Sequence, residues 1–276
     1  MASTEDLQAY EEENLLLSLP KEKGWVAQHL YLFQDFWYPS NFIEGVINFQ
    51  KHFQAKDSDV IVATVPKSDK LSDLSNMTEP RVFGTHVPFP SLPKSIKESN
   101  CKIVYICRNP FDTIVSLWIF ANKNNPLNEL TIEETLEKYC KGILGFGPTW
   151  EHMLGYWKES IANPNKVLFL KYEELKENAN FYVKRVAEFL DCPFTEEEES
   201  NGVIESIINL CSLEKMKNLE VNKAGTFCGN FEKKYLFRKG EIGDWVNYFS
   251  QAMIEKLSKT MEEKLGGSGL SFKTSS

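Results

Sequence analysis

The sequence predicts an α/β fold: a single domain with a mainly parallel central sheet flanked by helices. Short runs rich in β-branched and aromatic residues stop abruptly at polar residues or proline, as the buried strands of parallel sheets do. Segments with helical apolar spacing lie between and after these runs. The chain has 276 residues, 42% of them apolar, which is sufficient for a sizeable core.

Four segments have the character of buried strands. The first is an uninterrupted run of β-forming residues that stops at Pro66. In chain order the four segments are 60–65, 81–85, 102–107 and 166–171. Because helical patterns separate most of them, we expect parallel strands whose carboxyl ends meet at one edge of the sheet.

Helical patterns fill the intervals between and after these strands. Asn109-Pro110 is a favourable helix entry, because proline is well tolerated in the first turn. Thr131-Ile-Glu-Glu134 has the spacing of a capping box. Gly266-Gly267 indicates the end of a C-terminal helix as a C-cap. The helices expected from these signals and from apolar spacing are 112–122, the segment after Thr131, 183–190 and 250–265.

The charge balance limits the classes of partner. Lys plus Arg number 31 and Asp plus Glu number 39, which gives a formal net charge of −8. Such a chain lacks the broad basic face that a phosphate backbone requires, so we expect no nucleic-acid partner. Since no apolar run approaches the ~20 residues of a membrane span, we also expect no membrane partner. An anionic ligand must therefore be held by a local pocket.

The N-terminus and the cysteines indicate a cytoplasmic protein. Residues 1–20 are acidic and polar, unlike a signal or transit peptide, and we expect a frayed terminus followed by one domain over 21–276. The six cysteines are scattered, without a CxxC pair or zinc-ligand spacing. Without a secretory signal, we interpret them as reduced thiols.

Polar side chains follow three of the predicted strands. Lys67 and Ser68 follow the first, His86 the second, and Arg108 the third, leading into a helix that carries Ser116. Ligands of parallel sheets bind at the carboxyl ends of strands, so we expect these residues to converge on an anion. Each residue alone is more often structural, and the other histidines, which have no motif partners, are interpreted as structural: His29, His52 and His152.

A second group of polar residues lies near the C-terminus. Arg238 and Lys239 are adjacent cations followed by Gly240. Arginine offers a planar fork to phosphate oxygens, lysine a point charge, and glycine a close approach of the backbone. The pattern indicates a loop that wraps a phosphate, with an ordinary surface turn as the alternative.

Taken in order, these motifs resemble those of the cytosolic sulfotransferases, which use 3′-phosphoadenylyl sulfate (PAPS). The similar segments are Val65-Pro-Lys-Ser68 (phosphosulfate loop), Thr85-His-Val-Pro88 (catalytic histidine), Cys107-Arg-Asn-Pro-x-Asp112 (3′-phosphate site) and Arg238-Lys-Gly-x-x-Gly-Asp-Trp245 (C-terminal signature). Three segments resemble the plant branch, which includes the flavonol sulfotransferases: Phe146-Gly-Pro148, Trp150-Glu-His-Met-Leu-Gly-Tyr-Trp157 and Leu265-Gly-Gly-Ser-Gly-Leu270.

The resemblance implies the PAPS-dependent sulfotransferase fold, with a P-loop-like core, and a role for each motif residue. His86 would be the general base that takes the proton of the acceptor hydroxyl, and Lys67 would neutralise charge on the bridging oxygen. The implied nucleotide contacts are Lys67, Ser68, Arg108, Ser116, Tyr172, Met216, Arg238, Lys239 and Gly240. The implied reaction sulfates a hydroxyl of a small molecule, flavonoid-like or another plant metabolite, releases adenosine 3′,5′-bisphosphate (PAP) and needs no metal.

After Ser68 the sequence departs from the family pattern. The family motif continues as Gly-Thr-Thr-Trp, whereas this chain continues as Asp69-Lys-Leu-Ser. Only 18 residues lie between Lys67 and His86, where the family places several dozen, so we expect an internal deletion. The missing glycine and hydroxyls would remove N–H and O–H donors from the phosphosulfate loop.

Two other functions are compatible with parts of this pattern. A catalytically impaired or inactive truncated relative would keep only part of the nucleotide site. A P-loop kinase or NTPase fits less well, because the sequence lacks GxxxxGK[ST] and an evident magnesium carboxylate. The motifs leave the acceptor and the oligomeric state open.

Overall fold

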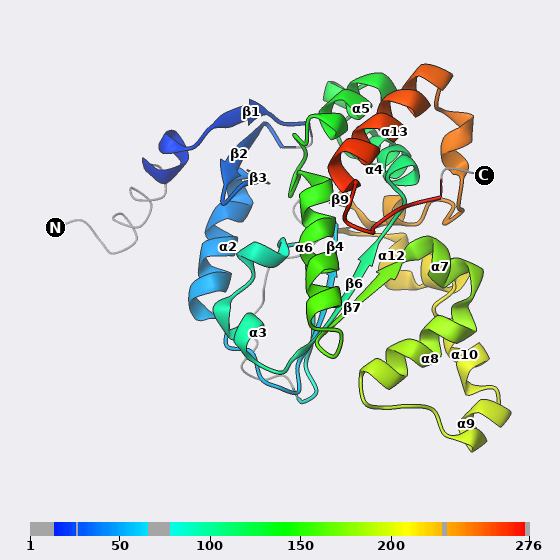
Figure 1. Ribbon diagram of the computed structural model, residues 1–276. Coiled ribbons are helices and arrows are strands. Elements are labelled where there is room, and N and C mark those ends of the chain that lie inside the picture. The colour runs from blue at the N-terminus through cyan, green and yellow to red at the C-terminus, as the bar shows by residue number, and fades with distance from the viewer. Residues whose placement is uncertain (1–13, 26, 66–77, 228–230, 274–276) are drawn as a thin grey trace.

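The central sheet has four parallel strands in the order β5–β4–β6–β7. The computed structural model in Figure 1 describes residues 14–25, 27–65, 78–227 and 231–273. The strands are β4 (Val60–Thr64), β5 (Val82–Thr85), β6 (Lys102–Cys107) and β7 (Val167–Lys171). Ile61 of β4 lies beside Phe83 on one side and Ile103 on the other. The four carboxyl ends therefore lie at one edge of the sheet.

Both faces of this sheet are covered, because successive side chains of β6 alternate between them. Ile103 belongs to the larger core, to which α2 (Ser40–His52) and α6 (Thr149–Ala162) also contribute. Val104 packs in a smaller cluster on the other face, against α8 (Ala179–Phe189). Figure 1 shows α6 and α8 on either side of the β6–β7 pair. Burial on both faces accounts for the continuous apolar character of these strands.

A second core joins the C-terminal part of the chain to the helix after β6. It is built from α4 (Pro110–Asn124), α5 (Ile132–Cys140) and α13 (Gln251–Leu265). Phe111 of α4 lies 4.8 Å from Trp245, measured between ring centroids. This packing brings the segment before α13 against the first turn of α4, directly beyond β6 (Figure 1).

An antiparallel sheet near the N-terminus was not among the predicted elements. It consists of β1 (Lys21–Lys23), β2 (His29–Phe33) and β3 (Phe36–Pro39). The β2–β3 hairpin turns through Gln34 and Asp35, both with positive φ. Tight hairpin turns usually carry Asn-Gly or another glycine pair, and Gln34-Asp35 is not such a signal.

The remaining described elements are short helices and one small strand pair. They are η1 (Phe89–Ser91), α3 (Lys94–Glu98), η2 (Pro126–Asn128), α7 (Tyr172–Glu177), α9 (Glu196–Ser200), α10 (Val203–Leu210), α11 (Leu213–Asn218), α12 (Glu220–Lys223), β8 (Thr226–Phe227), β9 (Phe231–Glu232), η3 (Lys233–Leu236) and η4 (Asp244–Asn247). Within the described ranges, no helix has both the length and the apolar character to cross a membrane.

The predicted α/β fold is confirmed, and the ends of its four strands lie within one residue of the expected ones. The helix expected over 112–122 extends two residues further at each end, and the helix expected over 183–190 begins four residues earlier. The helix α6 was not predicted. The capping box at Thr131 is present, since its hydroxyl accepts the N–H of Glu134 and the Glu134 carboxylate accepts the N–H of Thr131. The C-cap of α13 differs slightly from the expected one. Gly266 ends α13 with φ of −52°, and the left-handed residue is Gly267.

Candidate active site

The carboxyl ends of the parallel strands bring together several residues that the motifs single out. His86 follows β5, Arg108 follows β6 and Tyr172 follows β7. Between β5 and β6 lies β4, which ends at Thr64. Lys67 and Ser68, which were expected just beyond β4, lie outside the described residues.

His86 is buried and is held by the strand beside it. Its Nδ1 lies 2.7 Å from the carbonyl oxygen of Thr64. The register explains this contact, because Thr85 pairs with Ala63 and the next residues along both strands are His86 and Thr64. A carbonyl oxygen only accepts, so in the neutral ring Nδ1 carries the hydrogen and Nε2 the lone pair. This tautomer can take up a proton at Nε2.

A second histidine, His152 of α6, lies behind the backbone of His86 and is completely buried. Its Nε2 lies 2.9 Å from the carbonyl oxygen of His86, and its Nδ1 lies 2.9 Å from the hydroxyl of Tyr105. Burial lowers the pKa of His152 to about 4, so the ring is neutral near pH 7. One turn further along α6, the Tyr156 hydroxyl donates to the carbonyl of Val87 at 2.7 Å.

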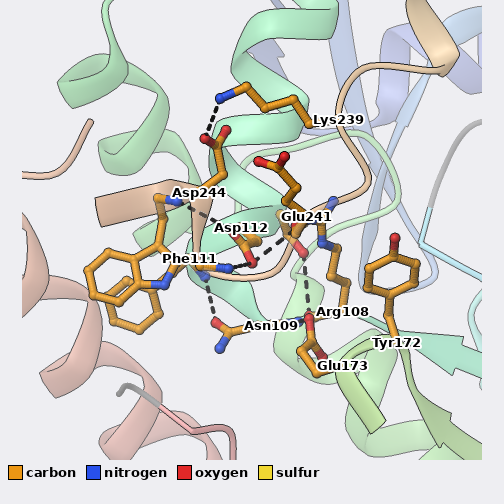
Figure 2. A network of polar contacts seen from close by, with 12 residues as sticks. Arg108, Asn109, Phe111, Asp112, Tyr172, Glu173, Lys239, Glu241 and Asp244 are labelled. Carbon is orange, nitrogen blue, oxygen red and sulfur yellow. Dashed lines mark hydrogen bonds and ion pairs between the residues drawn. The ribbon is translucent and has the colours of Figure 1, made fainter. Parts of the chain in front are cut away.

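Arg108 is held by three neighbours (Figure 2). Its Nη2 donates to the carbonyl oxygen of Glu241 at 2.6 Å, and Asp112 Oδ2 lies 3.7 Å from the same nitrogen. The guanidinium lies over the ring of Tyr172, 4.9 Å from its centroid. Among the described residues, Nε has no hydrogen-bond partner. Because a buried unpaired donor costs roughly 1–3 kcal/mol, an anionic oxygen bound here would be stabilising.

Asp112 holds residues 237–245, here called the C-terminal loop, against the start of α4 (Figure 2). Its Oδ2 accepts the N–H of Gly243 at 2.8 Å, and its Oδ1 accepts the N–H of Trp245 at 3.2 Å. Asn109 caps the same helix by accepting the N–H of Phe111 at 3.0 Å. The carboxylate of Asp112 therefore fixes the backbone of the C-terminal loop beside Arg108.

The two cations of the C-terminal loop are paired with a buried carboxylate. Arg238 Nη1 donates to Asp244 Oδ2, and Lys239 Nζ donates to Asp244 Oδ1 at 2.7 Å. Burial alone raises the pKa of Asp244, but the hydrogen bonds from Lys239 and Arg238 outweigh it and hold this pKa below its usual value. Arginine has five N–H donors and lysine three, so both side chains keep donors for a ligand anion.

Gly240 lies between Tyr172 and α11. Its φ is +65°, and a Cβ added there would lie 2.8 Å from Cδ2 of Leu213. The carbonyl oxygen of Gly240 accepts the Tyr172 hydroxyl at 3.0 Å. The helix that carries Leu213 also carries Met216, so Gly240 connects Tyr172 to the helix of Met216.

A cavity of about 410 Å³ opens at this edge of the sheet. Three of the predicted site residues line it, namely Arg108, Ser116 and Tyr172. Much of the remaining wall is apolar and includes Trp25, Leu30, Phe42, Leu144, Phe146 and Phe231. The other described site residues lie outside its lining: His86, Met216, Arg238, Lys239 and Gly240.

Comparison with known proteins identifies the family to which this arrangement belongs. The Sulfotransferase domain model matches residues 13–269. The chain belongs to the sulfotransferase family. It is 43% identical to cytosolic sulfotransferase 15 of Arabidopsis thaliana over 315 aligned positions, covering 96% of this chain and 88% of the relative. The predictions of a plant-type, PAPS-dependent sulfotransferase and of a cytosolic protein are thereby confirmed, and the kinase alternative is excluded.

Solved structures give the same result for the fold. An Arabidopsis thaliana sulphotransferase matches with a TM-score of 0.75 and 36% identity, covering 99% of each chain. The mouse sulfotransferase SULT7A1, whose crystal structure is described as complexed with PAP, matches with a TM-score of 0.74 and 25% identity. That match covers 86% of this chain and 94% of the mouse chain.

The aligned length bears on the expected deletion. The alignment with cytosolic sulfotransferase 15 has 315 positions, more than the 276 residues of this sulfotransferase. The relative therefore contains residues that have no counterpart here, as a deletion requires. Its place after Ser68 stays a prediction, because residues 66–77 lie outside the described part of the chain.

Three side chains that shape the site were missed by the sequence analysis. Asp112 and Asp244 stand inside the quoted motifs, but their spacing does not reveal which N–H groups and cations they bind. His152 was interpreted as structural, and its partners Tyr105 and His86 lie 47 and 66 residues away. Only the packing of α6 on the sheet brings these three residues together. His152 stands in the segment Trp150-Glu-His-Met-Leu-Gly-Tyr-Trp157, which resembles the plant branch, but this segment does not reveal its partners.

Proposed function

We propose that this sulfotransferase transfers a sulfuryl group from PAPS to a hydroxyl of a small apolar molecule, flavonoid-like in character, with His86 as general base. One observation carries the proposal, namely the convergence of site residues at the carboxyl edge of the sheet. There His86 lies beside the end of β4, and Arg108, Ser116 and Tyr172 line one cavity. Ligands of open parallel sheets bind at this edge.

The nucleotide half of the site offers donors suited to a phosphate. The Nε of Arg108, which has no hydrogen-bond partner within the described part of the chain, supports binding of a phosphate oxygen. Ser116 of α4 lines the same cavity. The Tyr172 ring would lie beside the adenine, with Met216 on α11 packing on the base. The PAP complex of the mouse sulfotransferase supports a nucleotide of this kind as ligand.

Asp244 determines how Arg238 and Lys239 can serve the 3′-phosphate. It holds the two cations side by side, and its hydrogen bond raises the pKa of Lys239. One carboxylate and two cations leave a net positive charge, so the group still attracts an anion. We expect the remaining N–H groups of Arg238 and Lys239, with the backbone of Gly240, to bind the phosphate.

The chemistry requires a base and stabilisation of the leaving group. As the acceptor oxygen bonds to sulfur, the bond from sulfur to the bridging phosphate oxygen breaks, and the hydroxyl proton passes to Nε2 of His86. The Nδ1–H of His86 faces the carbonyl of Thr64, which stabilises the resulting imidazolium. Lys67 and Ser68 would stabilise the charge that develops on the departing PAP. Positioning and charge stabilisation supply most of the rate, as in phosphoryl transfer.

The apolar wall of the cavity supports a flat apolar acceptor. Phe42 of α2 and Phe146 meet edge to face, 5.3 Å between centroids, and both line the cavity. Phe146 also contacts the ring of His86, 6.1 Å between centroids. A ring resting on these aromatic side chains would therefore present its hydroxyl close to His86.

The test is a transfer assay with radiolabelled PAPS and a panel of phenols and flavonols, including kaempferol and 4-nitrophenol. We expect a sulfated product from the wild type and a fall of at least about a hundredfold in kcat for His86→Ala, because the general base is lost. The matched control is His52→Ala, which removes an exposed histidine and should leave the rate unchanged. Activity retained in His86→Ala would refute the assignment of the base.

A second candidate function is a truncated relative that binds the nucleotide without transferring the sulfuryl group. The aligned length of 315 positions and the 18 residues between Lys67 and His86 favour it. It predicts that PAP binds while no acceptor in the panel is sulfated. Any sulfated product that requires His86 would exclude it.

A further inference from the structure

Three completely buried ring side chains surround the backbone that carries His86. They are Tyr105 of β6 and His152 and Tyr156 of α6, here called the aromatic triad. Tyr105 and Tyr156 stack at 4.2 Å with an angle of 14° between their planes, and His152 lies within 6 Å of both rings. The triad is a rigid part of the core, because each of its members packs against the other two.

The hydrogen bonds of the aromatic triad run in one direction. The carbonyl oxygen of His86 can only accept, so His152 donates to it from Nε2. The neutral His152 ring then has its lone pair on Nδ1, which accepts the hydroxyl of Tyr105. Tyr105 thus selects the tautomer of His152 that can hold His86. Burial of His152 lowers the pKa of its ring to about 4, so this ring stays neutral.

The position of His86 in the sheet explains why it needs such support. The strand β5 ends at Thr85, so the carbonyl groups of His86 and Val87 lie beyond the hydrogen-bond ladder. His152 and Tyr156 bind these two consecutive carbonyl oxygens from α6. At the ring of His86, the carbonyl oxygen of Thr64 accepts the hydrogen of Nδ1. The base is therefore held both through its ring and through its backbone.

We propose that His152 is a positioning residue for the transfer reaction, which fixes the backbone of His86 so that the ring keeps its Nδ1–H tautomer and its place. This inference rests on the proposed role of His86 as general base. A base must be held within a fraction of an ångström of the proton that it takes, and a misplacement of about 1 Å can cost a hundredfold in rate. His152 itself does not touch the reacting atoms.

The first test reads the histidine tautomers directly, without an acceptor. The chain has four histidines, so the imidazole nitrogen spectrum of the ¹⁵N-labelled full chain is simple to assign. We expect His152 as the Nε2–H tautomer, unprotonated between about pH 6 and pH 8, and His86 as the Nδ1–H tautomer. Replacement of His152 by Phe should abolish the Nδ1–H signal of His86, whereas His152→Gln, which keeps an N–H donor, should preserve it.

The second test measures kinetics with PAPS and the best acceptor of the panel. We expect His152→Phe to lower kcat by roughly tenfold to a hundredfold while the KM for PAPS changes by less than about twofold. His152→Gln should recover most of the rate. The matched core control is Ile96→Val, a fully buried position on α3 before the amino end of β6, which should change neither kcat nor the His86 signal.

If His152→Phe does not fold, Tyr105→Phe replaces it, because this variant removes only the hydroxyl that selects the tautomer. We then expect a mixed tautomer for His152 and a lower kcat. The proposal is overturned if a folded His152→Phe or Tyr105→Phe variant keeps both the His86 signal and kcat. It is also overturned if His152→Gln lowers kcat as much as His152→Phe does.

Failure of the proposed function would be recognised separately. If His86→Ala keeps the wild-type rate, or if no acceptor is sulfated, His86 is not an observable base, and the tautomer spectra alone decide whether His152 fixes His86. A His86 signal that is lost in His152→Phe and kept in His152→Gln supports the positioning contact. A signal that is identical in all three proteins refutes it.

Discussion

The neutral state of His152 makes the stability of this sulfotransferase depend on pH. Its pKa is 6.5 in an unfolded chain and about 4 in the folded protein, where burial disfavours the charged ring. Between these values the unfolded chain binds the extra proton, so stability rises with pH across this window. Neutral His152 contributes ~3 kcal/mol to the free energy of unfolding. This contribution is fully present above about pH 6.5 and is lost as the pH falls toward 4.

We predict that His152→Gln removes this dependence, because glutamine does not titrate. We expect urea unfolding to show that, from about pH 7 to about pH 5, the free energy of unfolding of the wild type falls by ~2 kcal/mol more than that of the variant. An equal loss in the two proteins would mean that another group is responsible. The matched control is His52→Gln at an exposed histidine, which should behave as the wild type does.

At the scale of single residues, the sequence singles out candidate site residues, but it does not reveal the partners of their charged groups. Arg108, Ser116 and Tyr172 line one cavity, and their contact with a nucleotide stays a prediction. The pairing of Arg238 and Lys239 with Asp244 was not predicted. A short motif gives the order of residues, whereas the partner of each charge depends on how the loop folds back on α4.

We expect the proposed nucleotide site to depend most on the shape of one element, the C-terminal loop. Gly240 and Gly243 both have positive φ, at +65° and +80°, so either glycine is strained by a side chain. They differ in their surroundings, because a Cβ at 240 would lie 2.8 Å from Leu213 whereas a Cβ at 243 meets nothing within 4 Å. Alanine substitutions at the two glycines can therefore be compared to distinguish the effect of backbone strain from that of close packing on α11.

We predict that Gly240→Ala weakens PAP binding more than Gly243→Ala does, although both lose ~1 kcal/mol of stability from backbone strain. Calorimetric titration of both variants with PAP measures the difference, which should reach about tenfold in Kd, because the loop must move away from Leu213. Shortening that neighbour in Gly240→Ala/Leu213→Ala should restore part of the affinity. Equal affinities for the two single variants would contradict the packing role of Gly240.

At the scale of elements, local chemistry accounts for which ones the sequence revealed. The capping box at Thr131 and the strand at 102–107 were predicted because their signals are contained in a few consecutive residues. The β2–β3 hairpin was not predicted, because its turn uses Gln34 and Asp35 in left-handed conformations. The tertiary contact of β3 with Gly147, at 2.8 Å from Trp37 N to the carbonyl oxygen, supports this turn.

The apolar wall of the cavity is a property of the whole molecule, since it comes from segments far apart in the sequence. Leu30 lies in the N-terminal sheet, Phe42 on α2, Phe146 before α6 and Phe231 on β9. No pattern within any one of these segments marks it as part of a pocket. The sequence could therefore predict the fold from alternating strands and helices, but not the shape of this cavity.

We predict that Phe42→Ala raises the KM for a flavonol acceptor roughly tenfold, because an aromatic wall of the cavity is removed, and leaves the KM for PAPS unchanged. Steady-state kinetics with kaempferol measures both values. The control is Phe33→Ala on β2, a half-buried aromatic residue of the neighbouring hairpin that does not line the cavity. A larger effect on PAPS than on the acceptor would place Phe42 in the nucleotide half instead.

The most direct test of nucleotide binding at the carboxyl edge of the sheet is calorimetric titration of the purified full chain with PAP. It needs no knowledge of the acceptor. We expect micromolar binding by the wild type and at least about a tenfold weaker Kd in Arg238→Ala, because a charge-assisted hydrogen bond to the 3′-phosphate is lost. Arg185→Ala, an exposed arginine on α8, should bind as the wild type does. Absence of binding by a folded wild-type chain, or an unchanged Kd in Arg238→Ala, would contradict the proposed nucleotide site.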